Sequence, residues 1–401
     1  MNFYLLSLIP LIVGGIIWVT CKRVNWIEWL IGSASAFLLA AIFHLISIHG
    51  MTSDIETWSG EITQARQFSA WQEYYEYAVY RTEYYWTTET YYTTDSKGRS
   101  HSHTRSVQKS RRVFDHWEPT TRWHNEHWEC YSDINTDYDI DKNKYIYFTE
   151  KYQMNKAVAG RRTTGEHNSR MIAGDPNDYT ADPSKTHWIE PVTKKVSWEN
   201  KVKAAPSVFS FIKVPTNVPV FSWPENPDPF HSQRVLGTAG KYISTLEWDK
   251  LNAYLGGRKK INLIIVGFDS SDSMLGQYQQ AKWIGGKKND LVITVGGKDL
   301  KKPDWCFTFG WTDSELSKQD ITSYVLVNGL TTNLYPFITK EVIMHYQIKE
   351  WKKFDYIRVE PATKYYYWFL GFMVVTQVGL YIFFSMNDFD KQKIFNGKLS
   401  V

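Results

Sequence analysis

Three long apolar segments stand out in the pattern of hydrophobic and polar positions along the chain. Residues 3–20 and 365–385 contain no charged side chain, and residues 26–48 contain only Glu28, near one end. Each segment has about the 20 residues that a helix needs to cross a bilayer. Tyr and Trp stand at several of the ends, where membrane interfaces favour aromatic rings. The pattern therefore predicts three transmembrane helices.

Residues 3–20 also have an alternative interpretation as a cleaved signal peptide. No positive residue precedes this segment, whereas Lys22 and Arg23 follow it, which is the reverse of a secretory signal. We therefore expect a true span. The turn at 21–25 and the tail at 386–401 then lie on one side of the membrane, and the region 49–364 lies on the other.

Basic residues near the membrane set the expected orientation. The turn and the tail both carry lysines or arginines, and such segments favour the cytoplasm. The chain has no N-x-S/T acceptor that would point to a glycosylated eukaryotic ectodomain. We therefore expect a bacterial or phage protein of the bacterial inner membrane, with residues 49–364 on the periplasmic or extracytoplasmic side. Five basic residues before the last span oppose this orientation: Lys349, Lys352, Lys353, Arg358 and Lys364.

The region 50–172 is rich in Tyr, Trp and Thr with alternating side chains, which is typical of β-strands. A long β-hairpin is predicted from 75–94 and 103–118, with its turn near Lys97–Gly98. A further strand is predicted at 144–152, KYIYFTEKY. The pattern indicates a β-rich extracytoplasmic region.

Composition changes at residue 173. The region 173–240 has frequent Pro and Asn, which favour extended segments and turns, so it is predicted to be a connector. From residue 241 onward, helical patterns alternate with continuous apolar runs. The predicted order is helix 244–257 ending at Gly256–Gly257, strand 261–269, helix 270–286 ending at Gly285, strand 291–297, strand 305–311, helix 316–326 and helix 336–357. This order predicts an α/β layered domain, which makes the chain an α+β membrane protein.

The sequence of this domain resembles the TPM domain family over residues 241–357. That family has a strand, a helix ending in Trp and glycines, an apolar strand and a partner strand that runs to a Gly. The corresponding segments here are INLIIVGFD, QQAKWIGGKKND, LVITV and CFTFGW. The resemblance implies a domain just outside a membrane, beside a transmembrane helix. Two features of the family pattern are absent here. The Asp-Arg pair that usually follows the second strand of the family is missing, and Tyr278–Gln279 stands where the family has Tyr-Ala. These departures weaken the inference that this domain shares the family's chemistry.

The resemblance also implies a divalent cation such as calcium as cofactor and, for some members, weak phosphatase activity. Candidate metal ligands are the aspartates near the ends of the predicted strands: Asp269, Asp272, Asp304 and Asp313. Hard cations need several converging oxygen ligands. In the simpler alternative, Asp272 caps a helix and the other three are solvated loop residues.

The Gly-Gly-Lys-Lys sequence at 285–288 raises the question of a phosphate site. A P-loop places its glycines between a strand and a helix N-terminus. Here the glycines follow a helix and precede a strand, and the dipole at a helix C-terminus disfavours phosphate. Lys287 and Lys288 are therefore predicted to complete a helix end.

Histidines and cysteines offer weaker candidates. The spacing of His124, His127 and Cys130 suits metal ligation, with His116 nearby, but partly buried or surface histidines are the preferred interpretation. Cys130 and Cys306 are expected to form either one disulfide or two separately buried thiols.

The predicted hairpin carries a strip of basic side chains, which could contact anionic lipid or an acidic partner, or form a solvated arm. Its members are Lys97, Arg99, Arg105, Lys109, Arg111 and Arg112. The net charge of +4 is too small to indicate a nucleic-acid partner.

No nucleophile motif, metalloprotease motif or dinucleotide fingerprint occurs in the sequence. We therefore expect a membrane-anchored binding protein that assembles with or modulates a membrane protein complex, with the lipid bilayer and other membrane proteins as partners. The alternatives are a metal-dependent phosphatase and a subunit of a homo-oligomeric pore. Predicted spans with Glu28 as their only charge offer little for an ion path.

Overall fold

The computed structural model describes residues 3–21, 26–94, 99–152, 154–157, 170–171, 176–180, 190–205, 209, 211–225 and 228–386. The chain divides into two compact units, one formed by Met1–Ser59 with Thr193–Val401 and the other by Gly60–Val192. Residues 22–25, Lys97–Gly98 and 387–401, on which the predicted turns and tail fall, lie outside the described residues.

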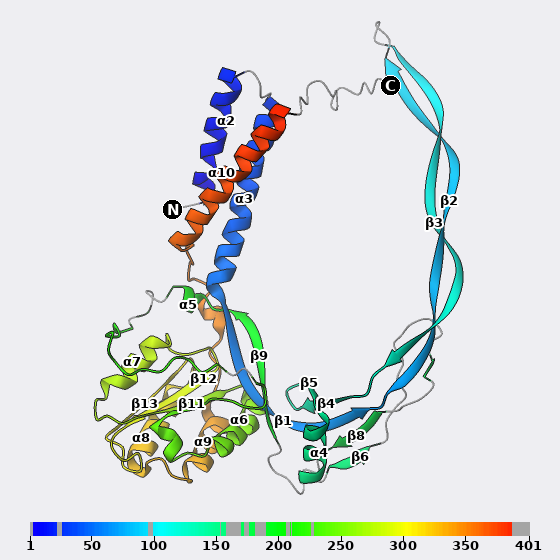
Figure 1. Ribbon diagram of the computed structural model, residues 1–401. Coiled ribbons are helices and arrows are strands. Elements are labelled where there is room, and N and C mark those ends of the chain that lie inside the picture. Colours follow the sequence, from blue (N-terminus) through cyan, green and yellow to red (C-terminus); the bar gives the residue numbers. More distant parts are fainter. Residues whose placement is uncertain are drawn as a thin grey trace. The chain divides into compact units, whose positions relative to one another are not determined.

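Apolar helices of the first unit run alongside one another (Figure 1). α3 (Trp26–Thr52) and α10 (Thr363–Met386) contain stretches that are long and apolar enough to cross a membrane, by length and composition. The predicted span at 3–20 is shorter and broken, into α1 (Phe3–Leu6) and α2 (Leu8–Cys21). The break falls at Ser7, whose Oγ lies 3.1 Å from the carbonyl oxygen of Phe3 and 3.2 Å from that of Ala36. The fold is thus mixed α+β with two candidate membrane helices.

The helices pack through aromatic and small side chains. Phe3 of α1 lies 4.5 Å from Tyr366 and 5.2 Å from Phe369 of α10, measured between ring centroids, and Ala40 of α3 is buried against them. Gln377 of α10 donates a hydrogen bond of 3.0 Å to the carbonyl oxygen of Gly32 of α3. Interhelical bonds of this kind hold apolar helices together where water is absent.

A four-stranded sheet forms the α/β part of the first unit, in the order β10-β11-β12-β13. Its strands are β10 (Val235–Gly237), β11 (Asn262–Phe268), β12 (Asp290–Gly296) and β13 (Trp305–Gly310). The first three are parallel, and β13 is antiparallel to β12. The flanking helices are η2 (Thr238–Lys241), α6 (Thr245–Lys259), α7 (Met274–Lys282), α8 (Glu315–Asn328) and α9 (Leu334–His345). The order of elements from α6 to α9 agrees with the prediction, and β10 adds a strand inside the predicted connector.

Two helix ends differ from the prediction. α6 does not stop at Gly256–Gly257 but continues to Lys259, and Lys260 takes the left-handed cap position. Gly256 is instead needed because it lies against strand β1, where a Cβ atom would collide with the carbonyl oxygen of Ser59. α9 ends at His345 and does not reach residue 357. After α9 the chain turns, and Ile348 forms an isolated β-bridge with Thr312. The short helix η3 (Trp351–Phe354) follows, and its aromatic rings pack into a separate hydrophobic cluster.

The second unit contains a six-stranded sheet in the order β5-β4-β1-β8-β6, with β9 also paired to β1. Its strands are β1 (Ser53–Phe68), β4 (His127–Ser132), β5 (Asp137–Ile140), β6 (Asn155–Ala157), β8 (Pro176–Thr180) and β9 (Pro191–Glu199). Residues 53–59 of β1 and most of β9 belong to the first unit. The predicted connector therefore contains strands β8 and β9 as well as helix α5 (Lys201–Ala204).

The predicted strand at 144–152 is wrong, since α4 (Lys142–Lys151) occupies that position. Asp141 caps this helix by accepting a hydrogen bond of 2.7 Å from the amide of Lys144. Tyr145 and Phe148 are buried at helical spacing, so the aromatic residues that suggested a strand form one face of a helix.

The predicted hairpin is present and longer than expected. β2 (Trp71–Thr94) and β3 (Ser100–His124) pair along their whole length, and β7 (Arg170–Met171) pairs with β2 at Glu73 and Tyr74. The two strands form a twisted ribbon (Figure 1).

Candidate functional site

Helix α3 passes directly into strand β1, because the helix ends at Thr52 and the strand begins at Ser53. Alternate side chains of a strand point to the same face, so Asp54 and Glu56 point the same way. Both residues are buried. Buried carboxylates need cationic or hydrogen-bonding partners, since the loss of water is otherwise costly.

The partners come from three consecutive residues between α7 and β12. The Nζ of Lys287 is hydrogen-bonded to the carboxylate of Asp54, and the Nζ of Lys288 lies 2.9 Å from Oε1 of Glu56. Asn289 then donates a hydrogen bond of 2.7 Å to the carbonyl oxygen of Thr57. We call these six residues the α3–β1 joint: Asp54, Glu56, Thr57, Lys287, Lys288 and Asn289.

A left-handed turn presents the lysines to β1. α7 ends at Lys282, and the next positive φ belongs to Ile284 at 54°, followed by Gly285 at 79° and Gly286 at 89°. The predicted helix end at Gly285 is therefore wrong, because the left-handed position is already taken by Ile284. A Cβ atom at Gly285 would lie 2.9 Å from the ring of Trp311, so this turn needs glycine. The lysines contact the carboxylates of β1.

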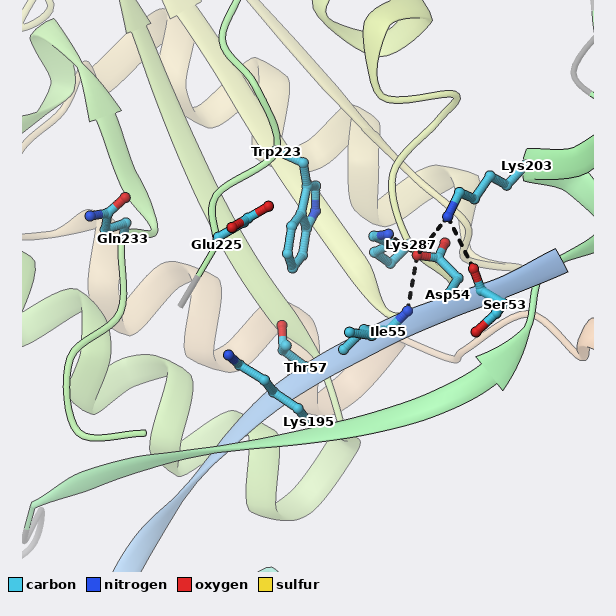
Figure 2. Close-up of a pocket in the computed structure, with 10 residues that line it drawn as sticks. All are labelled: Ser53, Asp54, Ile55, Thr57, Lys195, Lys203, Trp223, Glu225, Gln233 and Lys287. Carbon is cyan, nitrogen blue, oxygen red and sulfur yellow. Dashed lines mark hydrogen bonds and ion pairs between the residues drawn. The ribbon is translucent and has the colours of Figure 1, made fainter. Parts of the chain in front are cut away.

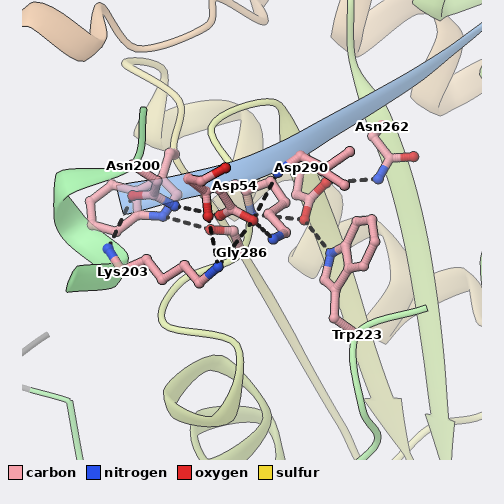
Figure 3. Close-up of polar contacts among 11 residues, drawn as sticks. Asp54, Asn200, Lys203, Trp223, Asn262, Gly286 and Asp290 are labelled. Carbon is pink, nitrogen blue, oxygen red and sulfur yellow. Dashed lines mark hydrogen bonds and ion pairs between the residues drawn. The ribbon is translucent and has the colours of Figure 1, made fainter. Parts of the chain in front are cut away.

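Helix α5 completes the surroundings of Asp54 (Figure 3). Asn200 donates a hydrogen bond of 2.7 Å to Oδ2 of Asp54, and the Nζ of Lys203 lies 3.8 Å from Oδ1. Burial by itself would raise the pKa of Asp54, but the hydrogen bond and charge of Lys287, with the hydrogen bond of Asn200, bring it below its ordinary value. Asp54 is therefore held as a carboxylate.

Tryptophan rings cover both lysines. The Nζ of Lys287 lies 5.0 Å from the ring centroid of Trp223, and that of Lys288 lies 5.0 Å from the centroid of Trp198. A cation over an aromatic face is attracted by the ring quadrupole. The lysine chains are thus fixed between a ring and a carboxylate.

A cleft of about 590 Å³ opens beside the joint (Figure 2). Lys195, Lys203 and Lys287 line it, together with Asp54, Glu225 and Trp223. Two of the three lysines are directed at Asp54, and none of the ten lining residues is a histidine or a cysteine. The carboxylate of Asp54 is thus neutralised by lysines on the cleft side, which suits attachment of β1 to the segment before β12.

Behind the joint, a second carboxylate is completely buried. Asp290 accepts hydrogen bonds from Asn262 at 2.7 Å, from the indole of Trp223 at 2.9 Å and from the amide of Lys287 at 2.8 Å. Burial raises the pKa of Asp290, and these donors oppose that rise. Asn262 and Asp290 are directly paired in the register of β11 and β12.

The polar contacts continue to Arg234, whose side chain is 1% exposed. Its Nε donates a hydrogen bond of 2.6 Å to Oδ1 of Asn262, and its Nη1 lies 3.6 Å from Oδ1 of Asp249. Burial lowers the pKa of Arg234 and raises that of Asp249, while their attraction opposes both changes. A continuous polar chain therefore joins helix α6, the sheet and the α3–β1 joint. The sequence analysis does not predict this polar chain, although the polar first residues of the apolar strands β11 and β12, Asn262 and Asp290, are a usable signal.

The structure does not bring the four predicted metal ligands together. Asp272 accepts a hydrogen bond of 3.0 Å from the amide of Met274 at the start of α7, and Asp304 accepts one from Ser271. Asp269 is in the same loop after β11. Asp313 follows β13, which runs antiparallel to β12, so it lies at the opposite end of the sheet, 2.9 Å from Lys353. Within the described ranges, no three His, Cys, Asp or Glu side chains are grouped as metal ligands.

The histidines have other neighbours. His124, the last residue of β3, stacks on Trp71 at 4.2 Å between centroids and lies 2.9 Å from the buried carboxylate of Glu73. His127 stacks on Phe68 at 4.7 Å. These residues lie on strands and do not share a helix face.

Cys130 and Cys306 are free thiols, which excludes the disulfide alternative between them. Cys130 is buried in β4 of the second unit, and Cys306 is partly buried in β13 of the first. Burial raises the pKa of each thiol to about 12.

Three of the six residues of the predicted basic strip, Arg105, Lys109 and Arg111, are paired with glutamates within the ribbon. Glu89 of β2 lies 3.3 Å from Arg105 and 2.9 Å from Lys109, and Glu83 lies 3.2 Å from Arg111. These cross-strand pairs favour the solvated arm over a lipid-binding surface.

Comparison with protein-family models, curated proteins and solved structures finds no match for this chain.

Proposed function

We propose that this chain is a membrane-anchored binding protein that assembles with or modulates a membrane protein complex. The observation that carries the proposal is the α3–β1 joint, which ties the α/β part to the end of an apolar helix. Consecutive residues Lys287, Lys288 and Asn289 contact Asp54, Glu56 and Thr57. A change at the membrane helix would therefore reach the sheet without passing through a flexible linker.

The proposed arrangement has three spans, formed by α1 with α2, by α3 and by α10. Residues 49–364 lie on the extracytoplasmic side, and residues 241–357 form a TPM-like domain. The helix bundle and the cytoplasmic preference of basic turns support this arrangement. Protease added to spheroplasts should cleave within 49–364. Full protection of that region while the inner membrane is intact would overturn the orientation.

A crosslinking experiment tests the binding role. The full chain is crosslinked in its native membranes and extracted in detergent, and the co-purifying membrane proteins are identified. We expect a membrane protein that is recovered with the wild type and depleted with Lys287→Met, which breaks the joint. The matched control is Lys298→Met, which replaces an exposed lysine after β12. Recovery of no membrane protein above a mock sample would overturn the proposal.

A weak metal-dependent phosphatase is the second candidate. The hydrogen bond from Ser271 to Asp304 brings the loop before β13 to the loop that follows β11, and such carboxyl-end edges of parallel strands are common ligand sites. Purified full chain is assayed on a generic phosphate ester with and without calcium or magnesium. Cation-dependent turnover that is lost in Asp272→Ala would favour this candidate over the binding role.

A further inference from the structure

A second cleft lies where the apolar helices meet the segment that leads into α10. It has a volume of about 560 Å³ and shares no lining residue with the cleft beside the α3–β1 joint. Its walls are residues 3–5 of α1, His44 of α3, residues 358–361 and Tyr366 of α10. Segments that are far apart in the sequence therefore surround one space.

The cleft lies at one end of the apolar helices. Tyr366 is in the first turn of α10, and His44 is one turn before the end of the apolar run at residue 48. The neighbouring Tyr367 and Trp368 are each 72% exposed. Exposed aromatic rings at the end of an apolar helix are typical of a membrane interface. If α3 and α10 cross a membrane, as proposed above, this cleft opens at the level of the lipid headgroups.

The part of the cleft formed by α1 is apolar and aromatic. The imidazole of His44 lies 6.3 Å from the ring of Phe3 and 6.1 Å from that of Tyr4, measured between centroids. Phe3 is almost completely buried, whereas Leu5 is 64% exposed. An apolar side chain that is exposed beside a cleft gains free energy when it is covered by hydrocarbon. This part of the lining therefore suits the glycerol end of an acyl chain.

The other part of the cleft carries two opposite charges. Arg358 and Glu360 line it with only Val359 between them in the sequence, and both side chains are exposed. Within the described residues, neither side chain has an ion-pair or hydrogen-bond partner. Lys353, earlier in the same segment, differs in this respect, because its Nζ lies 2.9 Å from Asp313. Charged groups that leave bulk water need a partner, so this cleft suits a ligand that brings both charges.

We propose that this cleft binds a phospholipid of the ethanolamine type, whose headgroup carries a primary ammonium group beside its phosphate. The guanidinium of Arg358 donates hydrogen bonds to the phosphate oxygens, and the carboxylate of Glu360 accepts hydrogen bonds from the ammonium. The acyl chains begin against Leu5 and Tyr4. This inference rests on the membrane placement of α3 and α10 that is part of the proposed function.

The two charges set the expected preference among headgroups. Phosphatidylglycerol offers the same phosphate to Arg358, but it has no cation for Glu360, and the carboxylate then faces a second negative charge. Phosphatidylcholine has a positive charge but no N–H group that could donate to Glu360. The ethanolamine headgroup satisfies both side chains by charge and by hydrogen bonds.

Lipid binding to the purified full chain tests the proposal. The delipidated protein in detergent is mixed with the ethanolamine, glycerol or choline phospholipid, all with the same acyl chains, and the bound fraction is measured by native mass spectrometry. We expect the ethanolamine lipid to bind about tenfold more tightly than the glycerol lipid, which is the effect of one charge-assisted hydrogen bond. Equal binding of the three lipids would overturn the headgroup assignment.

Two variants separate the roles of the charges. Arg358→Gln should weaken binding of all three lipids by about tenfold, because each of them has the phosphate. Glu360→Gln should remove the preference for ethanolamine over glycerol. The matched controls are Lys352→Gln and Glu350→Gln, which replace exposed charges outside the cleft and should bind lipid as the wild type does. Equal losses in the controls and the cleft variants would contradict the assignment, and circular dichroism shows whether each variant stays folded.

A photoreactive lipid locates the binding position. A phosphatidylethanolamine with a diazirine near the glycerol should label peptides that contain residues 3–5 or 358–361, and the label should decrease in Arg358→Gln. Labelling that is spread evenly over α3 and α10, with no decrease in that variant, would overturn the cleft as the site.

The membrane placement is tested separately by washing membranes with alkaline carbonate. Release of the full chain by this wash would overturn the membrane placement and the lipid site together. If the chain stays in the membrane and Arg358→Gln binds lipid as the wild type does, the lipid site alone is wrong and the membrane placement stands.

Discussion

The carboxylate of Asp54, two residues after the end of helix α3, is hydrogen-bonded to the ammonium group of Lys287, which lies 233 positions further along the chain. The side chains are 5% and 18% exposed, so the pair is shielded from water. An ion pair of this kind is costly to break from one side, because the remaining charge stays buried.

Replacement of Lys287 should therefore destabilise the first unit. We expect Lys287→Met to lower the free energy of unfolding by about 3 kcal/mol, as removal of one partner of a buried pair does. The measurement is a urea titration of tryptophan fluorescence on the full chain in detergent. The control Lys298→Met should change the free energy of unfolding by less than about 0.5 kcal/mol. Effects of Asp54→Asn and Lys287→Met that simply add in the double variant would contradict direct coupling.

The stability contributed by Asp54 should depend on pH. The folded-state pKa of Asp54 lies below its unfolded value of 3.8, so its contribution is fully present above that value. It is lost as the pH falls through the lowered folded-state pKa. We expect Asp54→Asn to show a smaller loss of melting temperature below pH 4 than the wild type. Lys298→Met should lose melting temperature with falling pH as steeply as the wild type does. If Asp54→Asn loses it equally steeply, Asp54 is not the source of this pH dependence.

Gly256 should be intolerant of a methyl group. Gly256→Ala places a Cβ atom against the backbone of Ser59 in β1, which must move to make room. We expect a loss of about 1–3 kcal/mol, typical of overpacking. Gly240→Ala is the matched control, since nothing lies within 4 Å of the added atom. Similar melting temperatures for the two variants would contradict the close approach of α6 to β1.

Neither Cys130 nor Cys306 should react in the native protein. Burial raises both pKa values to about 12, and the thiolate is the reactive form. Iodoacetamide at pH 8 should leave the peptides that contain these residues unmodified until urea is added, as measured by mass spectrometry. A disulfide-linked peptide that joins the two residues would contradict the structure.

The sequence predicted the α/β part well because buried parallel strands are continuous apolar runs. β11 and β12 are buried along their whole length and lie within one or two residues of the predicted ranges. α4 was misassigned because Tyr145 and Phe148 have high strand propensity, and the cap at Asp141 outweighed it.

The site itself could not be predicted from local pattern. Strand β1 contains Asp54, Glu56 and Thr57 at buried positions, so it has no apolar alternation that would mark it as a strand. The lysines that pair with this strand, Lys287 and Lys288, follow a predicted helix, where basic residues are common, so their position does not indicate a buried ion pair. Only the tertiary fold, which joins segments more than 200 residues apart, turns these charges into a joint.

The direct passage from α3 to β1 has a mechanical consequence. A pull along the axis of α3 reaches Ser53 without first straightening a loop, so it loads residues 53–59 along the strand direction. Lys287, Lys288 and Asn289 hold three different points of that segment, and they resist the sliding motion together. Tension in α3 is thereby delivered to the segment before β12 as shear, the loading direction in which parallel contacts fail all at once instead of one by one.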